Sequence, residues 1–426
     1  MIEKVLHPRN LYKAYHQVVS NKGAAGIDQM DISEFSSQWE EIRNTTVLAI
    51  LKMEYRPSPI RGVVIPKTNG KTRTLGVPTV IDRWLQQAVS QQLASKFDLG
   101  FEEESFGFRP QRNLQMAVRR SLKHINDGYQ DIVDIDLKGF FDEVPHYKLL
   151  QLVYDKVKCR TTLWLIRKWL RAPILLKGRL HKRRKGIPQG SPLSPLLSNI
   201  LLDQLDKHLK GKGHRFIRYA DDFSIYANSK ATARKIGNEV YLFLRDKLDL
   251  PINPEKSGIR RPGDFKVLGF GFVPTYKKGE RGKYQLIVAQ SGWQALKRKL
   301  KAITKKTMPY SLDERLRKLE EVWRGWVNNY RMASIYTKLK KLDEWLRNRL
   351  RYCIWHDWKK PERKRKNLIR LGVPIEKAYA WSRTRLGGWA IAQSPILGTT
   401  ITVSRLKRRG YLSMVDYYQT FRSEIQ

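Results

Sequence analysis

Two short segments of this chain place aspartates on strand-like runs. The segment 131–142 reads DIVDIDLKGFFD, and its alternation of acidic and apolar residues places Asp136 on one face of a strand. The segment 215–226 contains a strand-like run that ends at Asp221 and Asp222 and then resumes, as in a β-hairpin with carboxylates at its tip. A pair of aspartates also commonly forms a turn, so the hairpin alone does not decide between a chemical and a structural role.

Carboxylates that converge from separate strands repel one another unless a cation neutralises them. Hard divalent cations such as Mg²⁺ prefer oxygen ligands. Two such ions about 3.5–4 Å apart activate a hydroxyl group and stabilise the leaving group in phosphoryl transfer. In a chain with 82 Lys and Arg but only 40 Asp and Glu, acids on neighbouring strands therefore predict a two-metal site that acts on a polyphosphate.

The charge of the whole chain indicates the same class of partner. The 426 residues carry a formal net charge of +42, and 41% of them are hydrophobic, which is enough for two or three folded cores and excludes global disorder. Binding to phosphates releases counterions, so we expect a nucleic-acid partner, with an anionic membrane surface as the weaker alternative.

Cysteine usage and the amino terminus bear on the compartment. Cys159 and Cys353 are the two cysteines, and eight scattered histidines form no cluster with them, which excludes a disulfide framework and a Cys/His zinc site. The first residues carry charge and proline where a signal peptide needs about 7 to 15 apolar residues, and no run approaches about 18 apolar residues. We expect a cytosolic protein that is neither secreted nor membrane-spanning.

The elements that must position the acidic segments fall into two parts. Short β-branched runs, Gly and Pro punctuation and helical stretches such as 82–97 make the first two-thirds an α+β region. Residues 315–331 and 339–354 place apolar side chains at spacings of three and four, which predicts two amphipathic helices. Between the two parts, the charged and glycine-interrupted segment 276–286 is predicted to be a hairpin or a linker.

The last third of the chain has the higher density of positive charge. Residues 291–426 hold 32 basic and 11 acidic side chains, including the run RKRK at 363–366. A single run of this kind is at least as often a solvated helix face as a binding surface. Repeated runs on tryptophan-bearing helices favour contact with RNA or DNA.

Taken with the motifs around them, the two acidic segments resemble the reverse transcriptases encoded by bacterial group II introns. YADD alone is weak evidence, whereas a series of motifs in the correct order is strong evidence. The series consists of IPKTNGKTRTLGVP at 65–78, FGFRP at 106–110, DLKGFFD at 136–142, GIPQGSPLSP at 186–195, YADD at 219–222, NPEKS at 253–257 and LGF at 268–270. The later helices resemble the thumb and maturase (X) domain of this family in GWVNNY at 325–330 and RYCIWHDWK at 351–359.

The resemblance implies an α+β fold of the right-hand polymerase type, with fingers and a ferredoxin-like palm followed by an α-helical thumb and maturase X domain. We expect an N-terminal extension at 1–60, the fingers and palm at 61–280, and the helical thumb and maturase domain at 281–426. No Cys/His-rich endonuclease domain is expected, so that target DNA would have to be opened by something else.

The resemblance also assigns the catalytic residues. Asp136 and Asp221 match the two metal-bridging aspartates of the family, and Asp222 matches its third carboxylate, while the backbone carbonyl of Leu137 would complete a metal shell. The expected cofactor is two Mg²⁺ ions per active site, with Mn²⁺ as a substitute. Lys256 matches the lysine near the leaving pyrophosphate, where an ammonium group can act as a general acid.

Contacts to the nucleotide and to the nucleic acid follow in the same way. Lys67 and Arg73 are expected to meet the triphosphate, since a guanidinium group can bind phosphate with two hydrogen bonds. Phe141 resembles the steric gate that selects dNTP over NTP, with Phe140 as a core residue, and Gln189 is expected to contact template or nucleotide from a loop. The primer or template contacts are expected from the residues Leu268, Gly269 and Arg109.

The resemblance implies an RNA-directed DNA polymerase that copies intron RNA into cDNA and assists intron splicing as a maturase in the bacterial cytoplasm. Its partners would be an RNA template, intron RNA, a DNA primer or target, and dNTPs. Two alternatives stay open: an RNA-binding splicing cofactor with little polymerase role, and a reverse transcriptase recruited by a defence or repair system. The sequence leaves open whether the protein is a monomer or a homodimer.

Overall fold

The computed structural model describes residues 1–66, 70, 72–276 and 282–423. The chain divides into two compact units, Met1–Arg261 and Pro262–Gln426. This division lies earlier in the chain than the boundary expected at residue 280. The assignment of the chain to an N-terminal extension, to fingers and palm, and to a thumb and maturase domain stays a prediction.

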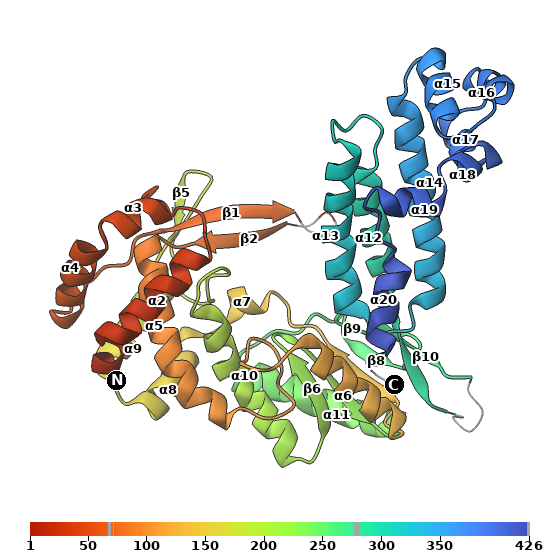
Figure 1. Cartoon of the computed structure of the whole chain (residues 1–426). Helices are drawn as coiled ribbons and strands as arrows, with labels where there is room; N and C mark the ends of the chain where they lie inside the picture. Colours follow the sequence, from red (N-terminus) through yellow and green to blue (C-terminus); the bar gives the residue numbers. More distant parts are fainter. Residues whose placement is uncertain (67–69, 71, 277–281, 424–426) are drawn as a thin grey trace. The chain divides into compact units, whose positions relative to one another are not determined.

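The first unit begins with helices that pack against one long helix (Figure 1). Thr79 caps the long helix α5 (Val80–Phe97) by accepting a hydrogen bond from the backbone N–H of Asp82 at 3.2 Å, as the N-cap rule predicts. Indole Nε1 of Trp84 in α5 donates to the carbonyl of Leu11 at 3.0 Å and ties α5 to the helix that carries Leu11. The packing helices are α1 (Ile2–Leu6), α2 (Pro8–Ser20) and α3 (Ile32–Ser37), and α4 (Trp39–Leu51) follows α3.

The first of the two sheets in this unit carries the motif at 65–78. Its strand order is β2-β1-β4-β5, in which β1 pairs antiparallel with β2 and parallel with β4. The strands are β1 (Ile60–Pro66), β2 (Thr72–Val77), β4 (Ile174–Leu176) and β5 (Arg179–His181). Lys67, expected at the triphosphate, lies outside the described residues.

The second sheet carries both acidic segments. Its order is β6-β7-β3-β8, and every pair of neighbours is antiparallel. The strands are β3 (Asp131–Ile135), β6 (Arg215–Tyr219), β7 (Asp222–Ala227) and β8 (Gly258–Arg260), and the helices packed on them are α6 (Leu114–Asn126), α10 (Ser194–Gly211) and α11 (Lys230–Leu242). The strand predicted within 131–142 is β3, which ends at Ile135, so that Asp136 directly follows it, and the predicted hairpin at 215–226 is formed by β6 and β7.

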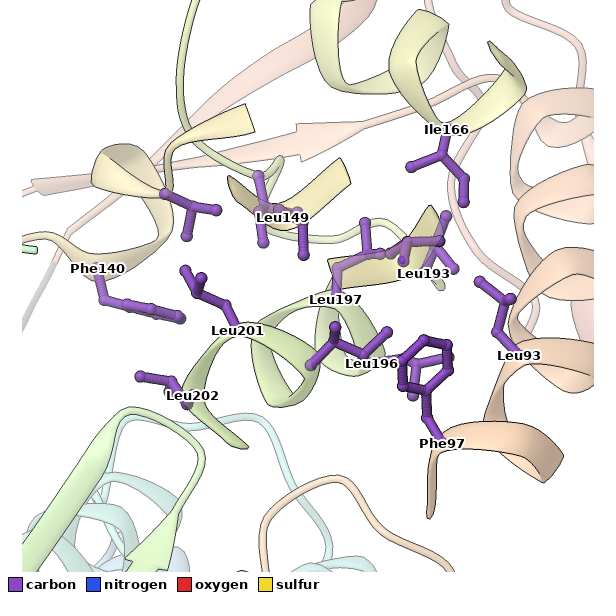
Figure 2. Packing of buried hydrophobic residues seen from close by; sticks show 14 of the residues in the cluster. Leu93, Phe97, Phe140, Leu149, Ile166, Leu193, Leu196, Leu197, Leu201 and Leu202 are labelled. Carbon is purple, nitrogen blue, oxygen red and sulfur yellow. The ribbon is translucent and has the colours of Figure 1, made fainter. Parts of the chain in front are cut away.

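Helix α10 lies at the centre of the hydrophobic core of the first unit. Figure 2 shows its leucines between side chains of α5 on one side and Phe140 on the other. The labelled core residues are Leu93, Phe97, Phe140, Leu149, Ile166, Leu193, Leu196, Leu197, Leu201 and Leu202. The remaining elements of this unit are the 3₁₀ turn Asp98–Gly100, α7 (Phe140–Glu143), α8 (His146–Val157), α9 (Arg160–Arg171) and the π-helical turn Phe243–Lys247. The core therefore fixes the elements that carry the acidic segments.

The second unit consists of a small sheet followed by helices (Figure 1). The sheet has the order β11-β10-β9, and β10 pairs antiparallel with β11. Of the two alternatives for 276–286, a hairpin or a linker, this pairing favours the hairpin, although residues 277–281 lie outside the described residues. Its strands are β9 (Lys266–Val267), β10 (Phe270–Pro274) and β11 (Tyr284–Val288). The helices are α12 (Gln290–Ile303), α13 (Leu312–Tyr330), α14 (Tyr336–Asp357), α15 (Pro361–Arg370), α16 (Ile375–Ser382), α17 (Gly388–Gln393), α18 (Pro395–Thr400), α19 (Val403–Arg408) and α20 (Met414–Ser423). The helices predicted at 315–331 and 339–354 are α13 and α14, and the α+β class is confirmed.

Candidate active site

Strand pairing brings the predicted metal-binding carboxylates together. Ile135 of β3 pairs with Phe223 of β7, and continuing this antiparallel register by one residue places Asp136 opposite Asp222. Asp221 lies in the two-residue turn that joins β6 to β7, where Tyr219 pairs with Asp222. Strand pairing therefore places Asp136 next to the adjacent residues Asp221 and Asp222, from which it is far apart in the sequence.

The pKa of the Asp222 carboxyl reflects the neighbouring carboxylates. Partial burial first, and then repulsion from Asp221, Asp136 and Asp134, raise the pKa of the Asp222 carboxyl from 3.8 to about 6, whereas Lys256 lowers it. The pKa of Asp134 is raised by burial and lowered by Arg260, whose Nε donates to Oδ2 of Asp134 at 2.8 Å. Asp134 is thus paired with its own arginine.

Asp136 is held by the segment that follows the π-helical turn. Its Oδ2 accepts from Nδ2 of Asn253 at 3.1 Å and lies 3.4 Å from Nζ of Lys256. Its backbone N–H donates to Oγ of Ser257 at 3.1 Å, and its carbonyl accepts from the N–H of Asn253 at 2.8 Å. The NPEKS motif therefore fixes both the backbone and the carboxylate of Asp136.

The site has the donor chemistry of a divalent-cation site. Asp222 is repelled by Asp221, Asp136 and Asp134, and Lys256 is the neighbouring cation, which leaves an excess of negative charge for a hard cation to neutralise. Within the part of the chain that the structure describes, no three His, Cys, Asp or Glu side chains are close enough to form a ready metal cage. One oxygen of Asp136 is turned toward Asn253 and Lys256. Leu137 is buried and forms a bridge with Ile252, and the predicted role of its carbonyl stays a prediction.

A buried arginine that the sequence did not single out supports the turn that carries Asp221. Arg218, the residue before the YADD motif, has no exposed surface, and its guanidinium pairs with the equally buried Asp206 of α10 at 2.5 Å. One of its nitrogens donates to the carbonyl of Ala220 at 3.0 Å and to Oδ1 of Asn199 at 2.8 Å, and the other donates to Oγ of Ser105 at 2.7 Å. Arg218 thereby ties the turn to α10 and to the segment before the FGFRP motif.

The FGFRP motif packs directly under the same turn. The N–H of Phe106 donates to the carbonyl of Arg218 at 2.8 Å, and a Cβ at Gly107 would lie 2.2 Å from the backbone nitrogen of Ala220. Only glycine permits this approach. Ala220 itself has a φ of +59°, a strained conformation for a residue with a side chain, which these contacts must maintain.

Arg109 of the same motif has a structural environment. Its Nε donates to Oδ1 of Asp98 at 2.7 Å, and its other two nitrogens donate to the carbonyls of Glu102, Ser105 and Asp98. Its side chain is 6% exposed. All three nitrogens are therefore engaged inside the first unit, and the expected contact with primer or template stays a prediction that would require some of these bonds to break.

Beside the carboxylates lies a cavity of about 700 Å³ that gathers the predicted nucleotide-binding residues. Arg73 from β2, Phe141 from α7, Gln189 from the loop before α10 and Asp221 from the catalytic turn all line it. Phe140, by contrast, is 2% exposed in the core, as expected. The described residues that were predicted to bind the nucleotide therefore line one cavity, together with Asp221 of the predicted metal site.

The loop GIPQG connects the walls of this cavity. The N–H of Ile187 donates to the carbonyl of Phe141 at 2.6 Å, and the N–H of Gly76 in β2 donates to the carbonyl of Gln189 at 2.7 Å. Gly186 has a φ of +87°, and a Cβ there would lie within 3 Å of the carbonyls of Phe141 and Asp142. The backbone thus couples the expected steric gate to the strand that carries Arg73.

Arg83 is a second cation of this cavity that the sequence analysis missed. It lines the cavity from α5, and one of its nitrogens donates to the carbonyl of Ala24 at 2.8 Å. Burial lowers the pKa of the Arg83 guanidinium, and the Asp28 carboxylate opposes this shift. Asn21 and Gly23 of the N-terminal segment line the same cavity. The sequence did not indicate that Arg83 lines this cavity, because its neighbours there belong to a segment about 60 residues earlier in the chain.

Leu268 and Gly269 lie in the second unit, in the turn between β9 and β10. Both residues have positive φ angles, +51° and +84°. A Cβ at Gly269 would lie 2.6 Å from the hydroxyl of Tyr330 at the end of α13. The turn is thus shaped by a helix of its own unit, and its expected contact with the primer stays a prediction.

Comparison with known families shows to which family this chain belongs. Residues 65–272 match the family "Reverse transcriptase (RNA-dependent DNA polymerase)", and residues 293–372 match "Group II intron, maturase-specific domain". The chain belongs to the group II intron-type reverse transcriptases. Membership implies catalysis with divalent metal ions.

Named relatives of this chain are similar over part of their length. The group II intron-encoded protein LtrA of Lactococcus lactis is 30% identical over 318 residues, 59% of this chain and 53% of LtrA. Protein YkfC of Escherichia coli K12 is 28% identical over 67% of this chain and 84% of that protein. The chain thus spans about half the length of LtrA. Among solved structures, a chain of a partial Cas6-RT-Cas1–Cas2 complex matches with a TM-score of 0.35 and 23% identity, covering 57% of this chain and 42% of that chain.

Across the residues that the structure describes, the chain has no helix that is both long enough and apolar enough to cross a membrane.

Proposed function

We propose that the protein is an RNA-directed DNA polymerase that extends a primer on an RNA template with dNTPs. The observation that carries this proposal is the cavity in which Arg73, Phe141, Gln189 and Asp221 meet beside Asp136 and Asp222. An incoming dNTP placed there would have cationic side chains for its triphosphate, an aromatic ring for its sugar and carboxylates at its reacting phosphorus.

The proposed cofactor is a pair of Mg²⁺ ions held by Asp136, Asp221, Asp222 and the carbonyl of Leu137, with Mn²⁺ as a substitute. When bound, the ions lower the pKa of the primer 3′-hydroxyl and stabilise the charge on the leaving pyrophosphate. Asn253 and Ser257 orient Asp136 for this task. Rotation of the Asp136 carboxylate away from Asn253 would open both of its oxygens to the ions.

The other residues position the nucleotide. Arg73, together with Lys67, is proposed to bind the triphosphate, Phe141 to exclude a ribose 2′-hydroxyl, and Gln189 to contact the template or the nucleotide. Lys256, 3.4 Å from Asp136, is proposed to supply positive charge and a proton to the leaving pyrophosphate. Leu268 and Gly269 are proposed to contact the primer, because the glycine lets the backbone approach the primer end. Arg109 is proposed to contact the primer or the template.

Primer extension tests the proposal. We predict that Asp221→Asn lowers the rate of dNTP addition on an RNA template at least about 10³-fold, because it removes a charge on which transition-state stabilisation depends, while RNA affinity stays within about threefold. Asp246→Asn, the same substitution at an exposed position paired with Arg245, is the matched control and should extend primers at the wild-type rate. Wild-type synthesis by Asp221→Asn would refute the metal assignment.

A second function is favoured by the helical unit. We infer that the helical thumb and maturase domain, residues 281–426, binds intron RNA in the bacterial cytoplasm and assists its splicing as a maturase. In this proposal residues 1–60 form an N-terminal extension, and residues 61–280 form the fingers and palm. The match of residues 293–372 to the maturase-specific domain and the 32 basic side chains after residue 290 support this inference. Splicing of a group II intron RNA from the source genome, with and without the Asp221→Asn protein, would separate the two functions, because a maturase role does not require the carboxylates.

A further inference from the structure

A cavity of about 410 Å³ in the second unit lies apart from the residues assigned to polymerisation. Elements from both halves of the unit form it: the start of α13, the end of α14, helix α15 and helix α19. Its apolar wall is built from five aliphatic side chains, which are Leu312, Ile354, Leu371, Ile401 and Leu406. Ile401 and Leu406 are almost fully buried, so this wall is a fixed part of the fold.

The remaining lining is strongly cationic. Four arginines line the cavity, Arg363, Arg370, Arg405 and Arg409, and Asp357 is the acid among the lining residues. Arg405 is anchored by donating to the carbonyl of Thr400 at 2.5 Å. Arg409 lies 3.5 Å from an exposed carboxylate oxygen of Asp313.

Two of these arginines have no acidic partner. Across residues 1–66, 70, 72–276 and 282–423, the guanidinium groups of Arg363 and Arg370 form no hydrogen bond or ion pair with the protein. Both belong to α15 and both are exposed. Nearby Lys364, in contrast, lies 4.5 Å from the centre of the Trp355 ring. The two arginines therefore offer their charge to a ligand from outside the chain.

An aromatic ring and an amide complete the lining. Trp358, at the end of α14, is half-buried and contacts Trp355 with 5.7 Å between ring centres. Asn367 of α15 holds its side chain in place by donating to the carbonyl of Arg363 at 2.9 Å. A flat apolar group that carries hydrogen-bonding edges and an anion fits a cavity with these four kinds of lining.

We propose that this cavity binds one unstacked nucleotide of single-stranded RNA, with its base against the aliphatic wall and Trp358 and its phosphate at Arg363 and Arg370. Unstacked bases bind to aromatic and apolar side chains, and arginine binds phosphate with two hydrogen bonds. The inference rests on the proposed RNA binding of the helical unit. The match to the maturase-specific domain ends at residue 372, and Ile401, Arg405, Leu406 and Arg409 come from beyond it, so the cavity is completed by residues outside that match.

The test compares two pairs of charge-removing substitutions in the full chain. The variant Arg363→Ala/Arg370→Ala removes the two unpaired arginines of the cavity. The control Lys366→Ala/Arg408→Ala removes two exposed cations from the same helix and from α19 that do not line it. Fluorescence anisotropy would measure the affinity for a labelled 12-nucleotide oligouridylate and for a 12-base-pair RNA duplex of random sequence.

We expect the cavity variant to bind the oligouridylate about tenfold more weakly than the control variant, since it loses phosphate contacts, and to bind the duplex within about twofold of the control. Trp358→Ala should give a similar selective loss, and Trp358→Phe should retain binding, which separates stacking from a folding defect. Equal affinities of the cavity and control variants for the oligouridylate would overturn the proposal, and so would equal losses on single-stranded and duplex RNA. Failure of the wild type to bind either RNA would instead overturn RNA binding as a whole.

Discussion

Phe140 and Phe141 are adjacent in the sequence but have different surroundings. Phe140 is buried in the core, whereas Phe141 lines the nucleotide cavity, with its backbone carbonyl bonded to Ile187. The sequence predicted this difference only through a resemblance, because two neighbouring phenylalanines at the start of a short helix have the same intrinsic preferences. Which of them faces a ligand is set by the packing of α10, which lies more than 50 residues later.

Replacement of Phe141 tests the steric gate. We predict that Phe141→Ala lowers the preference for dNTP over NTP about 10- to 100-fold, because the cavity gains room for a 2′-hydroxyl and selection by shape is worth about that much. Single-nucleotide addition with dGTP and GTP on an RNA template would give kcat/KM for each. Phe140→Leu is the control, since it changes the core beside the gate and should leave the preference unaltered. An unaltered preference in Phe141→Ala would place the gate elsewhere.

At the scale of elements, the strands that carry the aspartates could be predicted from the sequence, whereas the residues that support them could not. Alternation of apolar and acidic residues marked β3, and the interrupted strand-like run marked the β6–β7 hairpin. The support of the hairpin comes from Asp206 and Asn199 in α10 and from Ser105, which no local pattern connects to Arg218. A buried ion pair is a property of the tertiary fold, so the sequence shows only four polar residues in apolar surroundings.

The Arg218 network gives a prediction at this scale. Arg218→Met alone should lower the free energy of unfolding by about 3–5 kcal/mol, because Asp206 would be left as a buried, unpaired charge. The double variant Arg218→Met/Asp206→Leu should recover most of that stability, since exchange of a buried ion pair for apolar side chains is often neutral.

Recovered stability should not restore the position of the catalytic turn. We predict that the double variant retains KM for dNTP within about threefold but has a kcat lowered about 10- to 100-fold, because Ala220 loses the hydrogen bond that holds its strained backbone and small misplacements of catalytic groups have effects of that size. Urea unfolding and steady-state primer extension would measure the two quantities. A stable double variant with the wild-type kcat would show that Arg218 serves the fold alone.

At the scale of the whole molecule, charge was the most informative property of the sequence. A net charge of +42 indicated a polyanionic partner before any motif was considered, and the unequal charge density marked the helical unit. Composition did not reveal which cations lie exposed without partners and which, like Arg218 and Arg315, are buried under the surface. That distinction decides where nucleic acid can bind, and it required the structure.

A buried histidine, His124, makes the stability of the fold depend on pH. His124 of α6 is 6% exposed, packs 5.1 Å from the ring centre of Tyr226, and has no hydrogen-bond partner for either ring nitrogen within the described residues. Burial and the positive charges of Arg215 and Arg120, opposed by Asp127 and Glu104, lower its pKa from 6.5 to about 4.

Because the folded protein holds His124 neutral, the stabilising effect is present in full above pH 6.5 and is lost as the pH falls toward 4. Between pH 8 and pH 5 this one group should lower the free energy of unfolding by about 2 kcal/mol. Urea unfolding of the wild type and of His124→Phe at the two pH values would measure the difference, since all other titrating groups are common to both proteins. We expect the wild type to lose about 2 kcal/mol more than His124→Phe, and equal losses would show that His124 can be protonated in the folded state.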